Sequence, residues 1–289
     1  MLNLKQPIQT QLVMARQTGV VGVKGTIGDI TFYKSKDGDL ARKKTSLDRD
    51  QVMNDPAFKG SRKAMSEFGR ASSASKLLRK AFSEHTEAAK DHSTHYRCNT
   101  AMATVLRLDT TSAKGKRKVH LGNVRHLAGF QWNSLSHLNN ILRVQEQVTM
   151  NPGTGGMKVI IPSLVATTGL DVPSGATHFK VVFAGAALAL ETEKLKQKSQ
   201  ESGYLPINDS PTGPLALTVT VSTTDANLLC AGLGIQFFIL SGGNYLPMKG
   251  NAAFGLVGVE TLAKAPVEEQ PVVEEVATQA AAPVQQMLF

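Results

Sequence analysis

The chain has 289 residues, enough for one large or two smaller hydrophobic cores, and its hydrophobic fraction of 42% is typical of a folded protein. No stretch approaches the roughly 18 apolar residues of a membrane-spanning helix. The first residues lack the apolar region and cleavage site of a secretory signal, so we expect cytoplasmic synthesis and no membrane span.

The charge is distributed unevenly along the chain. Residues 1–125 hold 24 Lys and Arg against 11 Asp and Glu, residues 126–263 hold 7 against 8, and residues 264–289 hold 1 against 4. A basic first part beside a neutral second part indicates that the first part meets an anionic partner.

The first predicted element is a β-ribbon over residues 18–44, within an N-terminal extension and arm that we place at residues 1–45. The segment "DITFYKS" alternates in the manner of a strand, and Asp37-Gly38 is a strong hairpin signal. Glycines at every third position would let the ribbon twist or lie close to another backbone. We therefore predict an arm made for assembly, with these residues: Gly19, Gly22, Gly25, Gly28, Phe32 and Tyr33.

A basic helical segment is expected over residues 46–126. Asp55 and Pro56 mark the start of a helix, as a cap and a first-turn proline. Met65 and Phe68 would lie on its apolar face, and a break is expected near Gly69. A further helix over about residues 88–108 would turn Tyr96, Ala103 and Leu106 inward.

After residue 126 the hydrophobic pattern of the sequence changes from that of helices to that of strands. Five apolar runs separated by Pro, Gly, Asn and Ser predict an antiparallel, immunoglobulin-like β-sandwich over residues 127–263 that folds alone. Residues 264–289, rich in Pro, Ala and Glu, predict a disordered acidic tail. The fold class expected is α+β: an N-terminal β-ribbon arm, a helical segment, the sandwich and the tail.

Candidate catalytic and metal-binding residues are few. His85, His92, His95 and Cys98 spread over one sector of a helix, which is compatible with a shared metal and better explained as a polar helix face. Cys98 and Cys230 lie far apart and have no activating context, which suits a reducing compartment. We predict no enzyme activity, no cofactor, no metal and no small-molecule substrate.

Two basic clusters are candidates for contact with an anion. They comprise these residues: Arg42, Lys43, Lys44, Lys114, Lys116, Arg117 and Lys118. Lysine and arginine neutralise the phosphates of nucleic acids. An acidic protein surface, such as that of a neighbouring copy or of the acidic tail, is the other partner considered, because few aromatic residues lie nearby to stack on bases.

Four stretches resemble an uncharacterised protein family common in Bacteroidota. They are "GTIGDITFYKSKDGDLARKK", "NDPAFKGSRKAMSEFGRASSASKLLR", "PSGATHFKVVFAGAAL" and "LGIQFFILSGGNYLPMKGNAAFGLVGVE". The likeness runs from Met14 to Glu260, which leaves Met1 and Met14 as alternative starts. The glycine-rich strand and basic helix are also loosely similar to virion-associated proteins of phages from those bacteria. The resemblance to this family implies no catalytic residues for the chain.

These observations lead to one functional hypothesis and one alternative. The first is a non-enzymatic structural subunit, a homo-oligomer that self-assembles into a repeated particle, tube or filament of virion-like type. A glycine-rich arm can add a strand to a neighbour's sheet. The alternative is a nucleic-acid-binding protein that uses the basic arm and helices.

Overall fold

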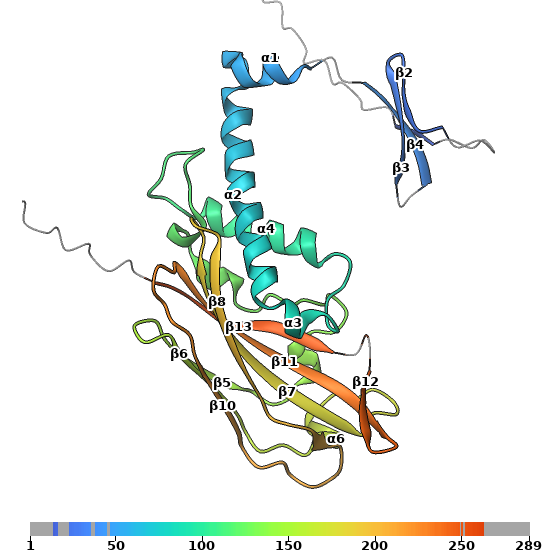
Figure 1. Ribbon diagram of the computed structural model, residues 1–289, viewed down its shortest axis with the longest axis vertical. Helices are drawn as coiled ribbons and strands as arrows, with labels where there is room; N and C mark the ends of the chain where they lie inside the picture. Colours follow the sequence, from blue (N-terminus) through green and yellow to red (C-terminus); the bar gives the residue numbers. More distant parts are fainter. Residues whose placement is uncertain are drawn as a thin grey trace, which may run out of the picture. The chain divides into compact units, whose positions relative to one another are not determined.

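The chain divides into two compact units, Met1–Met65 and Ser66–Phe289. The computed structural model describes residues 14–16, 23–35, 38–44, 47–248, 250 and 252–262 (Figure 1). Gly19, Gly22 and the tail at residues 264–289 lie outside the described residues. Helices and antiparallel sheets occur together, so the predicted α+β class is confirmed.

The first unit contains a four-stranded antiparallel sheet in the order β1-β4-β3-β2. The strands are β1 (Met14–Arg16), β2 (Gly25–Ile27), β3 (Ile30–Ser35) and β4 (Gly38–Lys43). Ser35 pairs with Gly38, which confirms the predicted hairpin, although Gly38 belongs to β4 and not to the turn. A second tight turn joins β2 to β3 at Gly28, whose φ of +57° is a conformation that glycine adopts without strain.

Three helical segments follow the sheet: α1 (Arg49–Asn54), the 3-10 turn η1 (Pro56–Phe58) and α2 (Lys59–Ala81). Asp55 caps η1 by accepting a hydrogen bond from the Ala57 amide at 2.8 Å, and Pro56 stands in the first turn, as expected. The break predicted near Gly69 was wrong. Gly69 lies within one continuous helix of 23 residues, and the division between the two units falls inside this helix.

The centre of the second unit is a sheet built on two long strands, β7 (His178–Ala189) and β11 (Leu228–Ser241). The strands β12 (Asn244–Pro247) and β13 (Ala253–Thr261) pair with the outer edge of β11. The strands β8 (Lys194–Glu201) and β9 (Leu205–Pro206) pair with the outer edge of β7.

A smaller sheet in the order β10-β6-β5 covers one face of this central sheet, with α5 (Leu138–Ile141) and α6 (Ala166–Gly169) beside it. Its strands are β5 (Gln147–Asn151), β6 (Gly156–Ile161) and β10 (Leu215–Thr220). Alternate residues of the long strands, among them Phe183 and Leu233, are buried on this side.

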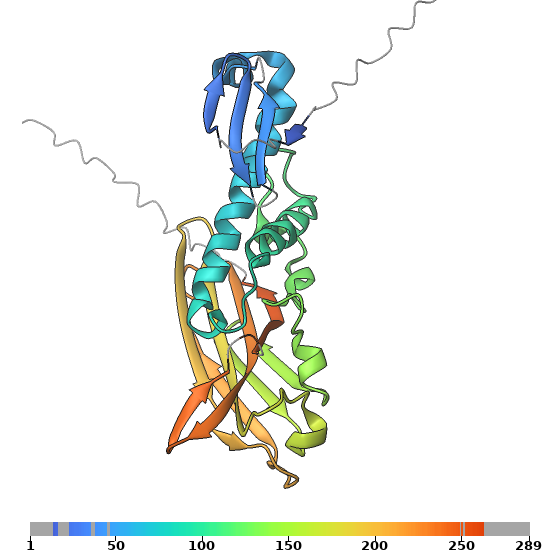
Figure 2. The same ribbon diagram turned by 90° about the vertical axis from the view of Figure 1, so that its right-hand side faces the viewer.

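Helices cover the opposite face of the same sheet over one half of its length, and the end that carries β12 lies beyond them (Figures 1 and 2). They are the second half of α2, α3 (Ser83–Thr86), α4 (Thr94–Arg107) and the 3-10 turns η2 (Val119–Leu121) and η3 (Val124–Leu127). Leu78, Phe82 and Met102 from this layer share one buried cluster with Cys230 and Phe254 from the sheet.

The domain boundary expected between residues 126 and 127 would therefore divide the core that the helices share with the central sheet. The reason is that β7 and β11 are buried on both faces, so the sandwich needs the helices as a third layer. A two-layer immunoglobulin domain has no such layer.

One helix face predicted from the sequence was wrong, and a second was wrong at one residue. Met65 and Phe68 were expected to be buried and are 57% and 62% exposed, and Tyr96 is 68% exposed. In α4, Leu106 is buried and Ala103 packs partly buried against the core, as predicted, and Cys98, Met102 and Val105 complete the buried face.

Candidate interaction surfaces

One face of the four-stranded sheet of the first unit carries a cluster of apolar side chains, and Lys43, opposite Ile30, borders the cluster on the same face. Cross-strand pairing places Ile27 opposite Ile30 and Phe32 opposite Ala41, so these four side chains share one face. Tyr33 and Arg42 lie on the other face, where the Arg42 guanidinium sits 5.6 Å from the centre of the Tyr33 ring. Ile27 and Ile30 are 64% and 46% exposed.

No described residue between positions 23 and 65 is buried. Phe32 and Tyr33, both predicted arm residues, are half-buried, and Gly25 and Gly28 adopt positive φ angles. Leu47 and Met53 of the same unit are also largely exposed. The described part of this unit therefore presents apolar side chains to solvent without a core of its own.

The predicted anion-contacting residues fall into two groups with different surroundings. Arg42, Lys43 and Lys44 are exposed at the end of β4. Lys114 and Lys116 are exposed on a loop of the second unit, and no salt bridge to either is found among the described residues.

Arg117 and Lys118, in the same loop, already have acidic partners. Lys118 pairs with Glu191 at 2.5 Å, and the Arg117 Nε lies 3.9 Å from Glu67. Arg70 of α2 holds the loop by donating to the carbonyl oxygens of Gly115 and Arg117 at 2.6 and 2.7 Å. These hydrogen bonds attach the loop to α2, and two of its four basic side chains have an acidic partner.

Sequence reasoning missed a second row of basic side chains, on the edge strand β8. Lys194, Lys196 and Lys198 alternate along the strand, share one face of it and are exposed. The alternation "KLKQK" was visible in the sequence, and its period of two is the signal of one strand face. Lys196 donates to the Ser222 hydroxyl at 2.9 Å.

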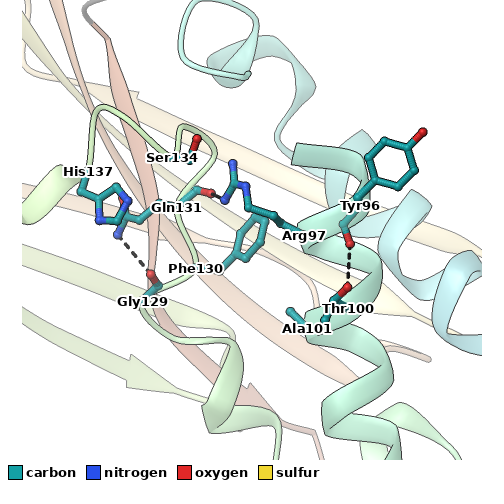
Figure 3. A pocket seen from close by; sticks show the side chains of 9 residues that line it. All are labelled: Tyr96, Arg97, Thr100, Ala101, Gly129, Phe130, Gln131, Ser134 and His137. Carbon is teal, nitrogen blue, oxygen red and sulfur yellow. Dashed lines mark hydrogen bonds between the residues drawn. The ribbon is translucent and has the colours of Figure 1, made fainter. Parts of the chain in front are cut away.

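A shallow hollow of about 570 Å³ lies between α4 and the loop at residues 129–137 (Figure 3). Tyr96, Phe130 and His137 are among its lining residues. Arg97 at its wall is fully engaged, because it donates to the Gln131 and Trp132 carbonyl oxygens at 2.6 and 3.0 Å and pairs with Asp91 at 3.0 Å.

Asp91 ties the loop beside this hollow to the start of α4. Its carboxylate accepts hydrogen bonds from the amide and hydroxyl of Ser134 at 2.8 and 2.6 Å, and from Ser93 and Thr94. Burial alone would raise the pKa of Asp91, and these hydrogen bonds outweigh it and hold the pKa well below its usual range. The neighbouring Leu135 is 90% exposed at the tip of this pinned loop.

A second hollow, of about 480 Å³, lies between α2, the start of η2 and the turn that joins β7 to β8. Arg70, Lys118, His120, Glu191 and Glu193 contribute charged or titratable groups to its lining. Burial lowers the pKa of His120, against the opposing effect of Glu191. Arg70 and Lys118 already have partners within the fold. We therefore interpret the charged groups of this hollow as a network that stabilises the structure.

The four residues weighed as metal ligands do not converge. Cys98 is buried, with its thiol 3.8 Å from the Ser75 carbonyl oxygen, while His92 and His95 are exposed. His85 stacks on Phe254 with ring centres 6.4 Å apart. The described residues contain no group of three His, Cys, Asp or Glu able to hold a metal ion.

Comparison of the chain with protein-family models, curated proteins and solved structures gives no match. The resemblance to a Bacteroidota family and to phage virion proteins therefore stays a prediction. No helix among the described residues is long and apolar enough to cross a membrane.

Proposed function

We propose that the protein is a non-enzymatic structural subunit that self-assembles into a repeated, virion-like particle, tube or filament through its first unit. The observation that carries the proposal is the apolar cluster on one face of the four-stranded sheet, in which Ile27 and Ile30 are exposed. No described residue between positions 23 and 65 is buried.

The physical argument is that a small sheet gains stability by covering an apolar face. Three or four strands need a hydrophobic face packed on something to be stable in water. A neighbouring copy supplies such a cover, and repetition of the same contact produces an assembly with many subunits.

The edges of the sheet favour the same partner. Among the described strands, β2 and β1 are the outer strands of the order β1-β4-β3-β2, so each has one edge without a strand partner there. Open edges of this kind pair readily with a strand from another chain.

The test is a comparison of two matched pairs of substitutions. Ile27→Ser with Ile30→Ser removes an exposed cross-strand aliphatic pair from the first unit. Ile239→Ser with Leu246→Ser removes an equivalent pair, 38% and 51% exposed, from β11 and β12. The first variant should shift the protein to monomer in analytical ultracentrifugation, and the second should leave the mass unchanged. An unaltered mass for the first variant would contradict the proposal.

Nucleic-acid binding is the second candidate function. The exposed lysines Lys114 and Lys116, without a salt bridge among the described residues, favour it. Replacing both by Gln should lower the slope of log affinity against log salt by about 0.9 for each duplex phosphate that the variant no longer neutralises. DNA retention that does not change with salt would exclude this function.

A further inference from the structure

The edge strand β8 presents a row of three lysines that have no acidic partner among the described residues. Lys194, Lys196 and Lys198 are exposed, and the salt bridges between described residues include none of them. Residues two apart on a strand repeat about every 6.6 Å on one face. Such a row complements an extended chain that carries several negative charges.

The carboxylates nearest to this row in sequence compensate it only in part. Glu191 pairs with Lys118, and Glu201 pairs with Lys180 at 2.9 Å. Glu193, in the turn before Lys194, offsets part of the charge of the row.

The last described residue, Leu262, lies one short loop away from the row. Its amide donates to the Asn227 carbonyl oxygen at 2.8 Å. Asn227 ends the loop that begins near Ser222, and the Ser222 hydroxyl accepts the hydrogen bond from Lys196. Strand pairing also places Thr261, Leu228, Leu188 and Leu195 in one row across the sheet.

The chain that continues from this point is acidic. Residues 264–289 hold four glutamates, Glu268, Glu269, Glu274 and Glu275, against one lysine. From Leu262 to Glu268 the backbone spans up to about 20 Å. The three strand spacings from β13 to β8 add up to about 14 Å.

We propose that Lys194, Lys196 and Lys198 form a binding site for an acidic extended peptide, and that its occupant is segment 264–289 of the same chain. Tethering keeps the glutamates at a high effective concentration near the lysines, so exposed charge pairs of modest strength suffice. The segment would also compete with any external polyanion for the β8 lysines. This site is independent of the assembly surface on the first unit.

Zero-length carbodiimide cross-linking of the full chain tests the proposal, because it joins lysine to glutamate only in contact. Mass spectrometry should find links from the four glutamates to Lys194, Lys196 or Lys198. In a mixture of isotopically light and heavy chains, the links should join residues of one chain, and the yield should fall as salt rises. Links that join different chains, or that are absent, would overturn the proposal.

A pair of lysine variants separates specific docking from general charge attraction. The first variant carries Lys194→Gln, Lys196→Gln and Lys198→Gln. The total yield of cross-links between segment 264–289 and any lysine should fall roughly tenfold, as expected for the loss of three exposed charge pairs. Lys63→Gln, Lys76→Gln and Lys80→Gln remove the same charge from exposed positions of α2 and should have little effect. Equal effects of the two variants would show that the segment has no defined site.

A short single-stranded oligonucleotide tests the alternative occupant. Changing the four glutamates to Gln should increase oligonucleotide binding to the β8 lysines, because the site is then vacated. Oligonucleotide binding that requires these lysines and is unaffected by the glutamates would assign the site to nucleic acid. Either result leaves the ultracentrifugation test of the assembly surface unaffected.

Discussion

Truncation of Phe254 should destabilise the helices and the sandwich together. The ring of Phe254 is 1% exposed and contacts Trp132 and Phe82, with ring centres 5.1 and 5.4 Å away. A Cβ atom at Gly232 or Gly234 would overlap with this ring, so β11 leaves room for it by carrying glycine at both positions. Phe254 thus joins the sheet to the end of α2 and to the loop before α5.

The expected magnitude follows from the burial and the ring contacts. Phe254→Ala removes a fully buried ring, which costs about 3–5 kcal/mol of unfolding free energy in well-packed cores. A loss of this size lowers the melting temperature by roughly 2–4 °C per kcal/mol in a unit of about 200 residues. Urea denaturation followed by the fluorescence of Trp132, the single tryptophan, reports directly on this contact.

Two outcomes would refute the reasoning. One is a loss below about 1 kcal/mol, the level of an ordinary surface change. The other is a fluorescence transition that separates from the loss of helical circular dichroism, since independent domains would unfold in two steps. Phe68→Ala, at a position 62% exposed on α2, is the matched control and should change stability by less than about 0.5 kcal/mol.

Three further predictions test the interior of the second unit. Gly122→Ala should cost about 2 kcal/mol or more, measured by urea denaturation, because its Cβ would overlap with the Val105 carbonyl oxygen. Asp91→Asn should cost about 2 kcal/mol at neutral pH. Because the folded pKa of Asp91 is lowered, the wild type loses this contribution as pH falls below about 4, so the two proteins should converge in acid denaturation. Burial raises the pKa of Cys230 to about 12, so its thiol should resist alkylation until the protein is unfolded, as read by mass spectrometry.

Local sequence signals predicted the hairpin, the cap and the strands well. The Asp37-Gly38 signal and the alternation of "DITFYKS" specify β3 and β4, and Asp55 with Pro56 specifies the start of η1. These features depend on neighbours within a few residues of the chain, which sequence shows directly.

The features that sequence missed depend on contacts between distant segments. The helical period of α4 and the burial of Leu106 were predicted correctly, but Tyr96 points outward, and Cys98 and Met102 also point into the core. The spacing of apolar residues shows which stripes of a helix are apolar. Which of these stripes is buried depends on the layer that packs against the helix. The continuous helix through Gly69 has the same cause, since packing of its second half outweighs the roughly 1 kcal/mol that one glycine costs.

The small residues of the long strands explain why a layer packs on each face of the central sheet. "FAGAALA" in β7 and "CAGLG" in β11 look like ordinary strand interiors, yet glycine and alanine there let two layers approach the sheet from both sides. Gly185 faces Met157 and Val219 of the smaller sheet, while Gly232 faces Phe254 and Phe82. Strands buried on both faces read as continuous apolar runs, and such runs imply a third layer.

The two units differ in what an exposed apolar pair means for stability. Ile239 and Leu246 extend from a sheet whose strands β7, β11 and β13 contribute to two buried clusters, so their exposure costs the second unit little. Ile27 and Ile30 belong to a unit in which no residue described between positions 23 and 65 is buried. Under the assembly proposal, the stability of that unit includes the free energy of association and so depends on protein concentration.

Hydrogen exchange should therefore separate the two units. Amide protection in β3 and β4 should rise as the protein concentration rises, because association stabilises the sheet. Protection in β7 and β11 should stay constant, because those strands pair with each other and with further strands of the same chain. The Ile27→Ser and Ile30→Ser variant is the control, and it should remove the concentration dependence without changing protection of β7. If protection of β3 were high and independent of concentration in the wild type, the first unit would be stable without a neighbour, and its exposed face would carry no argument for assembly.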